Sequence, residues 1–285
     1  MDFVNGLSSS AFSLMMSAIG WMGWLGALAF ASAVFGILAL LVFKQISFQG
    51  GIKGVKDKIK GAMIEIRLYQ NDLAIVTKAV GKVLGRNVQY MALNFGPMLP
   101  LFVPFGLVAA QMVVWFGFVP IPVWNANRGE WMPGKGHEIV ATLDEDARGQ
   151  VRDIEVALPD TLELKSPIVR NERKGVIAFE VIAVAAGDAE IVFTFPDGTT
   201  DTKQIVTGDA HDGPLSGIRG SSFEDQLLWP SEGSYADSPL HQVKFDYPAR
   251  SLPWMIDGPL GIIGYFLVFS MIAGVAILKP LNIQI

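Results

Sequence analysis

Three long apolar blocks separated by polar stretches dominate the hydropathy pattern of the chain. They cover residues 21–43, 90–118 and 254–279. Each is long enough to cross a hydrocarbon layer of about 30 Å as a helix. We therefore predict three transmembrane spans. Residues 1–20 carry a loose apolar stripe, which is typical of an interfacial helix. A disordered start before the first span is the alternative.

Residues 44–89 combine apolar positions at helical spacing with many basic side chains. A turn signal at Asn71–Asp72 divides the stretch, so we predict a helical hairpin. Its basic surface could attract anionic lipid or an acidic partner such as ribosomal RNA or a nascent chain. No feature indicates sequence-specific recognition of nucleic acid. The basic residues of this surface are Lys53, Lys56, Lys58, Lys60, Arg67, Lys78, Lys82 and Arg86.

A strand-like pattern fills residues 137–207, where short alternating segments are separated by turn residues. Six strands at regular spacing predict an all-β, immunoglobulin-like sandwich. The expected strands are 137–143, 151–158, 162–166, 175–184, 189–195 and 200–207. We expect 119–136 to be a linker, 208–253 to be irregular with an edge strand at 241–250, and 280–285 to be a short tail.

Charge is distributed unevenly along the chain, and this predicts its orientation. Residues 44–86 hold nine Lys/Arg and three Asp/Glu, whereas residues 121–253 hold twelve Lys/Arg and twenty-two Asp/Glu. Basic loops near spans remain in the cytoplasm. The hairpin and the C-terminus are then cytoplasmic, while the N-terminus and residues 119–253 lie outside, as in the periplasm of a bacterial inner membrane.

Composition excludes several kinds of chemistry. The chain is 51% hydrophobic and 17% charged, and it has no cysteine, so disulfides and thiolate chemistry are excluded. No nucleotide-binding, zinc-protease or haem motif is present, and we expect neither enzymatic activity nor a cofactor. Asp209, His211 and Asp212 could hold a divalent cation, but a solvated loop is the favoured interpretation. A hydrolase triad of Asp209, His211 and Ser221 has no supporting motif.

The block 90–118 contains an unusual set of helix-breaking and polar residues. Prolines remove backbone donors, and polar groups are costly at membrane depth, so one face is expected to contact protein or a wet cavity. A simple kinked span, with the glutamine bonded to a neighbouring helix, is the alternative. The residues of this candidate groove or kink are Asn94, Pro97, Pro100, Pro104 and Gln111.

The basic hairpin that leads into Asn94–Phe105, NFGPMLPLFVPF, resembles the YidC/Oxa/Alb insertase superfamily. The three-span plan with an outside N-terminus is similar to its compact branch, which includes archaeal insertase-like proteins and relatives in the endoplasmic reticulum. The resemblance implies a non-enzymatic role in inserting other membrane proteins. The hairpin would then be a capture surface. The first span has no charged residue, so a groove would use Asn94, Gln111, Ser32 and exposed backbone.

Two other functions remain open at this stage. The chain could be an accessory subunit of a membrane complex, with the β domain and the Gly/Ala-rich spans contacting partners. A transporter or channel is less favoured, because few ionisable residues lie in the spans and no inverted repeat is evident. In every case the expected partners are the lipid bilayer and other membrane proteins.

Overall fold

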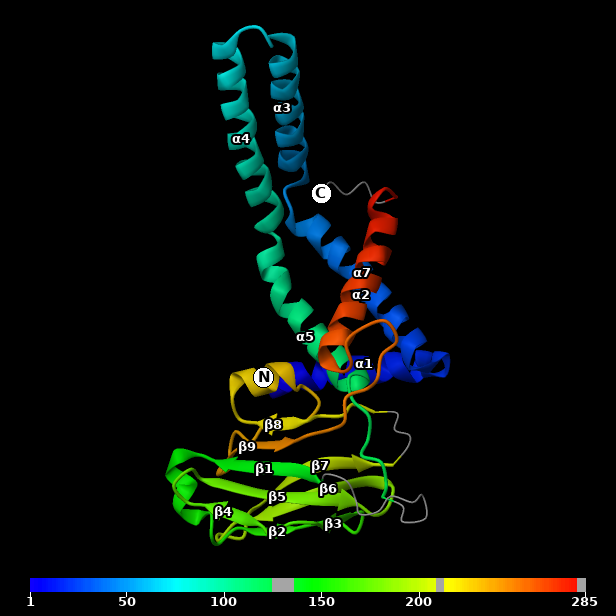
Figure 1. The fold of residues 1–285 in the computed structure, drawn as a ribbon, viewed down its shortest axis with the longest axis vertical. Coiled ribbons are helices and arrows are strands. Elements are labelled where there is room, and N and C mark those ends of the chain that lie inside the picture. Colours follow the sequence, from blue (N-terminus) through cyan, green and yellow to red (C-terminus); the bar gives the residue numbers. More distant parts are fainter. Residues whose placement is uncertain (125–135, 209–212, 281–285) are drawn as a thin grey trace. The chain divides into compact units, whose positions relative to one another are not determined.

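The computed structural model describes residues 1–124, 136–208 and 213–280 (Figure 1). Asp209, His211 and Asp212 therefore lie outside the described residues, as does most of the predicted tail. The chain divides into two compact units. The β unit comprises residues 1–28 and 106–266, and the hairpin unit comprises residues 29–105 with the chain from 267 onward.

Helices α3 and α4 form the predicted hairpin and lie side by side (Figure 1). Small and aliphatic side chains are buried where the two helices meet, and an ion pair between Lys82 and Glu65 at 2.8 Å crosses their surface. The Asp72 carboxylate accepts the backbone N–H groups of Ala74 and Ile75, so this residue caps α4. The helices span Gln49–Leu68 and Leu73–Phe95, and their buried residues are Ile52, Val55, Ala62 and Ala79.

Three helical segments are long and apolar enough to cross a membrane, which confirms the coarse prediction. The first contains α1 and α2, with a short 3-10 helix between them. This 3-10 helix ends before Gly23, the first residue of α2, whose φ of 73° is a conformation that glycine adopts without strain. The second contains α4 and α5, and the third is α7. The bounds are Asp2–Ile19 for α1, Gly20–Met22 for η1, Gly23–Ile46 for α2, Met98–Phe116 for α5 and Pro259–Leu278 for α7.

The β unit contains two antiparallel sheets (Figure 1). One has the order β3-β5-β1-β9-β8, with β4 also paired to β5, and the other has the order β2-β6-β7. The strands are β1 His137–Leu143, β2 Glu155–Ala157, β3 Leu162–Leu164, β4 Val169–Asn171, β5 Val176–Ala183, β6 Gly187–Thr194, β7 Thr200–Thr207, β8 Ile218–Gly220 and β9 Leu240–Phe245.

Both sheets contribute to one hydrophobic core. Residues of β1 and β5 alternate between buried and partly exposed, so these two strands place every second side chain inside. Ile139 and Phe179 come from the first sheet, and Phe193 and Ile205 come from the second. All four are at most 2% exposed, and this burial holds the two sheets together.

The structure corrects the prediction for residues 208–253. This stretch contains β8, the short helix α6 (Phe223–Leu228) and β9. Strand β9 pairs with both β1 and β8, so it is an inner strand and the prediction of an edge strand was wrong. Its covering neighbour β8 is only three residues long and ends in Gly220, which gives too little alternation to be recognised in sequence.

The expected linker 119–136 also begins inside the β unit. Ile121 is 1% exposed and donates its N–H to the carbonyl of Val206. Residues 117–119 pair with residues 248–250 through the bonds from Val119 N to Pro248 O and from Arg250 N to Gly117 O. We call this two-stranded connection the stem. It joins the end of α5 to the chain that leads into α7.

Helix α1 is anchored by polar contacts within the β unit. Asn5 donates to the carbonyl of Gln226 at 2.7 Å, Ser9 donates to the carbonyl of Pro230, and the Asp2 carboxylate accepts two bonds from Ser234. Residues 2–19 are therefore ordered as a helix, and the alternative of a disordered start was wrong.

Lys203 is fully buried in the β unit. Its ammonium donates to the carbonyls of Ser216 and Gln204, at 2.8 and 3.2 Å, and to the Glu232 carboxylate. Burial lowers the pKa of this ammonium, and the Glu232 carboxylate opposes that shift. Three acceptors match its three N–H groups, so the charge is kept inside without an unsatisfied donor.

We predict that Lys203→Met lowers the free energy of unfolding by about 3–5 kcal/mol, because it leaves the Glu232 carboxylate buried without its cation. Thermal or denaturant unfolding of the purified chain measures this. The exposed Lys244, on β9, provides the matched control, and Lys244→Met should change stability by less than about 0.5 kcal/mol. Equal effects of the two substitutions would contradict the role assigned to the buried pair.

Candidate functional site

The second apolar segment is interrupted between α4 and α5. Helix α4 ends at Phe95, Gly96 and Pro97 form a turn, and α5 begins at Met98. Pro100 lies in the first turn of α5, where backbone N–H groups have no partner within the helix, so it fits without further cost. Pro104 lies inside α5. The predicted break is thus present, and Gly96–Pro97 is its centre.

The prolines leave carbonyl groups without their usual helical donors. Pro97 and Pro104 have no N–H to offer to the carbonyls four residues earlier, those of Leu93 and Pro100. The carbonyl of Gly96 also loses its donor at the fourth position, but the N–H of Leu99 bonds to it at 3.3 Å. This stretch therefore carries acceptors that an unbroken helix would have satisfied.

An apolar groove of about 400 Å³ lies beside the break, within the hairpin unit. Aromatic, aliphatic and methionine side chains form nearly all of its wall. Flexible methionine and large phenylalanines can adjust to apolar partners of different shapes. The lining residues are Ala39, Leu40 and Phe43 of α2, Asn94 of α4, Met98, Leu101, Phe102 and Phe105 of α5, and Leu267 of α7.

Asn94 is the polar member of this wall. Its Nδ2 donates to the carbonyl of Tyr90 at 2.8 Å, which bonds it to its own helix. Its Oδ1 is buried and has no donor among the described residues. An orphan acceptor in apolar surroundings costs about 1–3 kcal/mol, so a donor that entered the groove would be stabilised here.

Gln111 does not line the groove. It is fully buried in the β unit, and its Nε2 donates to the hydroxyls of Ser8 and Ser9 on α1, both at 2.9 Å. Ser32 is also fully buried and is not a lining residue. Of the polar side chains expected to build a groove, the structure places Asn94 there, and Gln111 fixes a neighbouring helix instead.

The basic residues of the hairpin are distributed over both helices, and most are exposed. Three have contacts within the hairpin: Lys82 with Glu65, Arg86 with Gln89, and Lys56 over the ring of Tyr90 at 5.8 Å. The remaining residues keep their charge in solvent. They are Lys53, Lys58, Lys60, Arg67 and Lys78.

Sequence reasoning missed an exposed apolar stripe on α4. Its members recur at helical spacing, so they share one face of the helix. The same periodicity places Lys78, Lys82 and Arg86 on the opposite face. Phe95, at the end of the stripe, directly precedes the break. The stripe could have been found from the period of the large apolar residues, which are Leu73, Leu84, Val88, Met91 and Phe95, with Val80 between the first two.

Comparison of the chain with family models, with curated proteins and with solved structures gave no match. The groove, the break and the hairpin, together with the resemblance of residues 94–105 to the YidC/Oxa/Alb motif, are therefore the features that bear on function.

We predict that Gln111→Leu loosens α1 from α5, because the two serine hydroxyls lose their shared donor while the apolar volume is kept. A lost hydrogen bond of about 1 kcal/mol corresponds to roughly fivefold faster amide exchange. Hydrogen exchange across residues 2–19 measures the effect. Gln70→Leu, at an exposed position of the hairpin turn, is the control and should leave that exchange unchanged. Unaltered exchange in Gln111→Leu would argue against the anchor.

Proposed function

We propose that the chain is an integral membrane protein with its N-terminus and β unit outside and its hairpin in the cytoplasm. Three apolar helical segments of sufficient length support insertion. The basic excess in residues 44–86 and the acidic excess in residues 121–253 support the orientation. The bacterial inner membrane is the setting that this arrangement favours.

We further propose that it assists other membrane proteins in entering or assembling in the bilayer, without enzymatic chemistry. The observation that carries this proposal is the apolar groove beside a proline-broken helix. The groove offers an incoming apolar segment a surface of similar polarity. The carbonyls of Leu93 and Pro100, whose usual helical donors are replaced by Pro97 and Pro104, offer acceptors to backbone N–H groups that have not yet formed a helix. Each unsatisfied group in lipid costs several kcal/mol, so such sheltering lowers the barrier to entry.

The hairpin supplies a route to this groove. Helix α4 runs without interruption from the hairpin turn at Asp72 to the break after Phe95. Its apolar stripe would guide a hydrophobic segment, and the exposed basic residues would attract acidic flanking sequence or anionic lipid. This agrees with the capture role that the YidC/Oxa/Alb resemblance implies. The route ends at an uncharged groove, whereas bacterial relatives of that superfamily carry an arginine in the first core span.

We propose an immunoglobulin-like plan for the β unit. A constant-type immunoglobulin domain has the strands A, B, E and D in one sheet and C, F and G in the other. The orders β9-β1-β5-β3 and β2-β6-β7 correspond to these, with β1 in the place of B and β9 in the place of A. The match requires the A-like strand to come from the C-terminal end of the domain, with β8 as an addition at the edge.

An accessory-subunit role has less support. Two glycines that could have admitted a helix from another protein already serve packing inside the hairpin unit. A Cβ at Gly36 would lie 2.4 Å from the Ser270 carbonyl oxygen, and one at Gly274 would lie 2.9 Å from Leu40 Cδ1. The close approach of α2 and α7 thus uses these positions.

Site-specific photo-crosslinking tests the groove. A benzoylphenylalanine at Phe102, which lines it, should crosslink a ribosome-bound nascent chain that carries one apolar span. The control position is Met271 on α7, which does not line the groove. The two side chains are 66% and 64% exposed, so the comparison is matched for accessibility. We expect at least a fivefold higher yield at Phe102.

Equal yields at the two positions would overturn the groove proposal. A single resident protein that crosslinks at Phe102 whether or not translation is active would favour the accessory-subunit role. Depletion of the chain should lower insertion of at least one class of single-span reporter, and unchanged insertion of all reporters would contradict the insertase-like function.

A further inference from the structure

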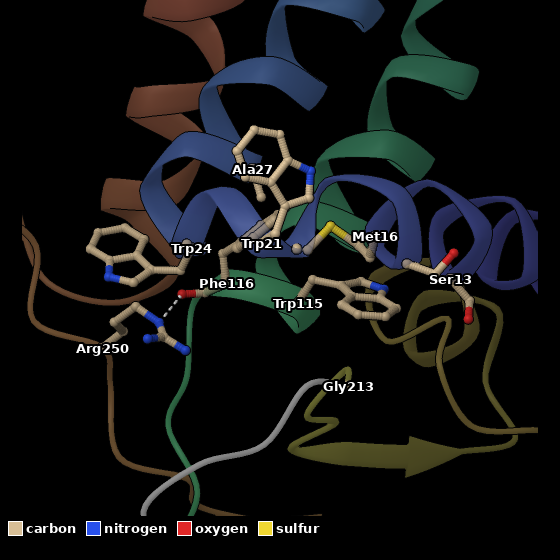
Figure 2. A pocket seen from close by; sticks show the side chains of 12 residues that line it. Ser13, Met16, Trp21, Trp24, Ala27, Trp115, Phe116, Gly213 and Arg250 are labelled. Carbon is tan, nitrogen blue, oxygen red and sulfur yellow. Dashed lines mark hydrogen bonds between the residues drawn. The ribbon is translucent and has the colours of Figure 1, made fainter.

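A second cavity, of about 590 Å³, lies within the β unit where α1, the start of α2 and the end of α5 meet the stem. Its wall differs from that of the groove, because it combines indole rings with hydroxyls and a cation. Figure 2 shows Arg250 bonded to the carbonyl of Phe116, with Trp24 and Trp115 nearby. The polar and aromatic lining residues used below are Ser13, Ser17, Trp21, Trp24, Trp115 and Arg250.

Arg250 is half-buried, and it has N–H groups that no described residue accepts. Its Nε donates to the Phe116 carbonyl at 2.8 Å, its Nη2 donates to the Phe118 carbonyl at 3.1 Å, and its guanidinium lies 5.4 Å from the centre of the Trp24 ring. These bonds use two of its five N–H groups. In the described part of the chain, no carboxylate lies within 4.0 Å to form an ion pair with it. Burial lowers its pKa, but an arginine remains protonated.

A second donor in the same wall lacks an acceptor. The Nε1–H of Trp115 is buried and makes no hydrogen bond within the described residues. Buried donors are almost always paired, so this N–H marks a hydrogen-bonding capacity that the described residues leave unused. Trp115 and Arg250 flank Phe116 in Figure 2, which also shows Ser13 on α1. Ser17, a second hydroxyl of α1, lines the same cavity.

We propose that this cavity binds the phosphate group of an anionic phospholipid from the outer leaflet. An arginine with N–H groups that no described residue accepts, together with serine hydroxyls, is a set that recognises a phosphate oxyanion. The inference rests on the proposed membrane orientation, which places these tryptophans in the outer interfacial belt.

The rim favours a lipid over a soluble anion. Trp21 and Trp24 line the cavity, and Trp21 is 84% exposed. Such side chains are suited to contact acyl chains at the level of the glycerol backbone. A free phosphate would leave this apolar rim in water, whereas a phospholipid would cover it and satisfy the polar wall together.

Native mass spectrometry of the full chain in a neutral detergent tests the proposal, with phosphatidylglycerol and the phosphate-free diacylglycerol of the same chains as probes. We expect retention of phosphatidylglycerol and not of diacylglycerol. Arg250→Gln should lower the phosphatidylglycerol affinity about tenfold, because a charge-assisted bond is lost. Arg173→Gln, at an exposed position of the β unit outside the cavity, is the control and should leave the affinity unchanged.

Arg250 also holds the stem, so a second pair of variants separates binding from folding. Ser17→Trp fills the cavity from α1 without touching Arg250, and it should abolish lipid retention. Ser10→Trp adds the same bulk at an exposed position of α1 that does not line the cavity, and it should retain lipid. If Ser17→Trp binds lipid as the unmodified chain does, the proposal is wrong.

Two further experiments test whether the ligand is a lipid and whether the chain is inserted in the membrane. Inorganic phosphate or an acidic peptide that displaces the lipid at comparable concentration would overturn the lipid assignment. Alkaline carbonate extraction of membranes distinguishes a failure of the membrane proposal from a failure of the lipid site. Release of the chain by carbonate would refute the proposed membrane insertion. Retention, combined with equal affinity in all variants, would refute the lipid site alone.

Discussion

Backbone polar groups in apolar surroundings must find partners, and the segment around Gly96–Pro97 lacks donors that an unbroken helix would supply. Pro97 and Pro104 cannot donate to the carbonyls of Leu93 and Pro100, and the Gly96 carbonyl accepts from the N–H of Leu99 instead. A helix with this defect cannot be covered by lipid on all sides without cost. The groove and the proposed handling of client segments follow from the same deficit, because both depend on acceptors that remain available.

The β unit is organised by the stem. Arg250 bonds to the carbonyls on both sides of Gly117, so the end of α5 is fixed to the chain that leads into α7. Gln111 and the serines of α1 extend this fixed region. The cavity proposed to hold a lipid phosphate lies in that region. Lipid would thereby contribute to holding α1 in position.

Long helices and strands with a regular hydrophobic pattern were predictable from the sequence. Very short strands, and contacts between residues far apart in the chain, were not. Alternation gave β1 and β7 with their observed bounds, and hydropathy gave the three apolar helices. Strands β4 and β8 are too short to show a period, and the place of β9 between β1 and β8 depends on pairing across a long stretch of chain. The prolines predicted the break, but Gln111 gave no sign of whether it faced a groove or α1, since both suit a buried amide.

The antiparallel pairing of β1 with β9 sets Ile139 opposite Phe245, so the chain enters and leaves the sheets at neighbouring points. An insertion with adjacent ends can be gained, lost or exchanged with little strain on its host. The pairing of β1 with β9 also fixes when the sheet can be completed during synthesis. The sheet that begins with β1 stays open until β9 has been synthesised, and α7 follows directly. During synthesis, the β unit can therefore be completed only shortly before α7 is made.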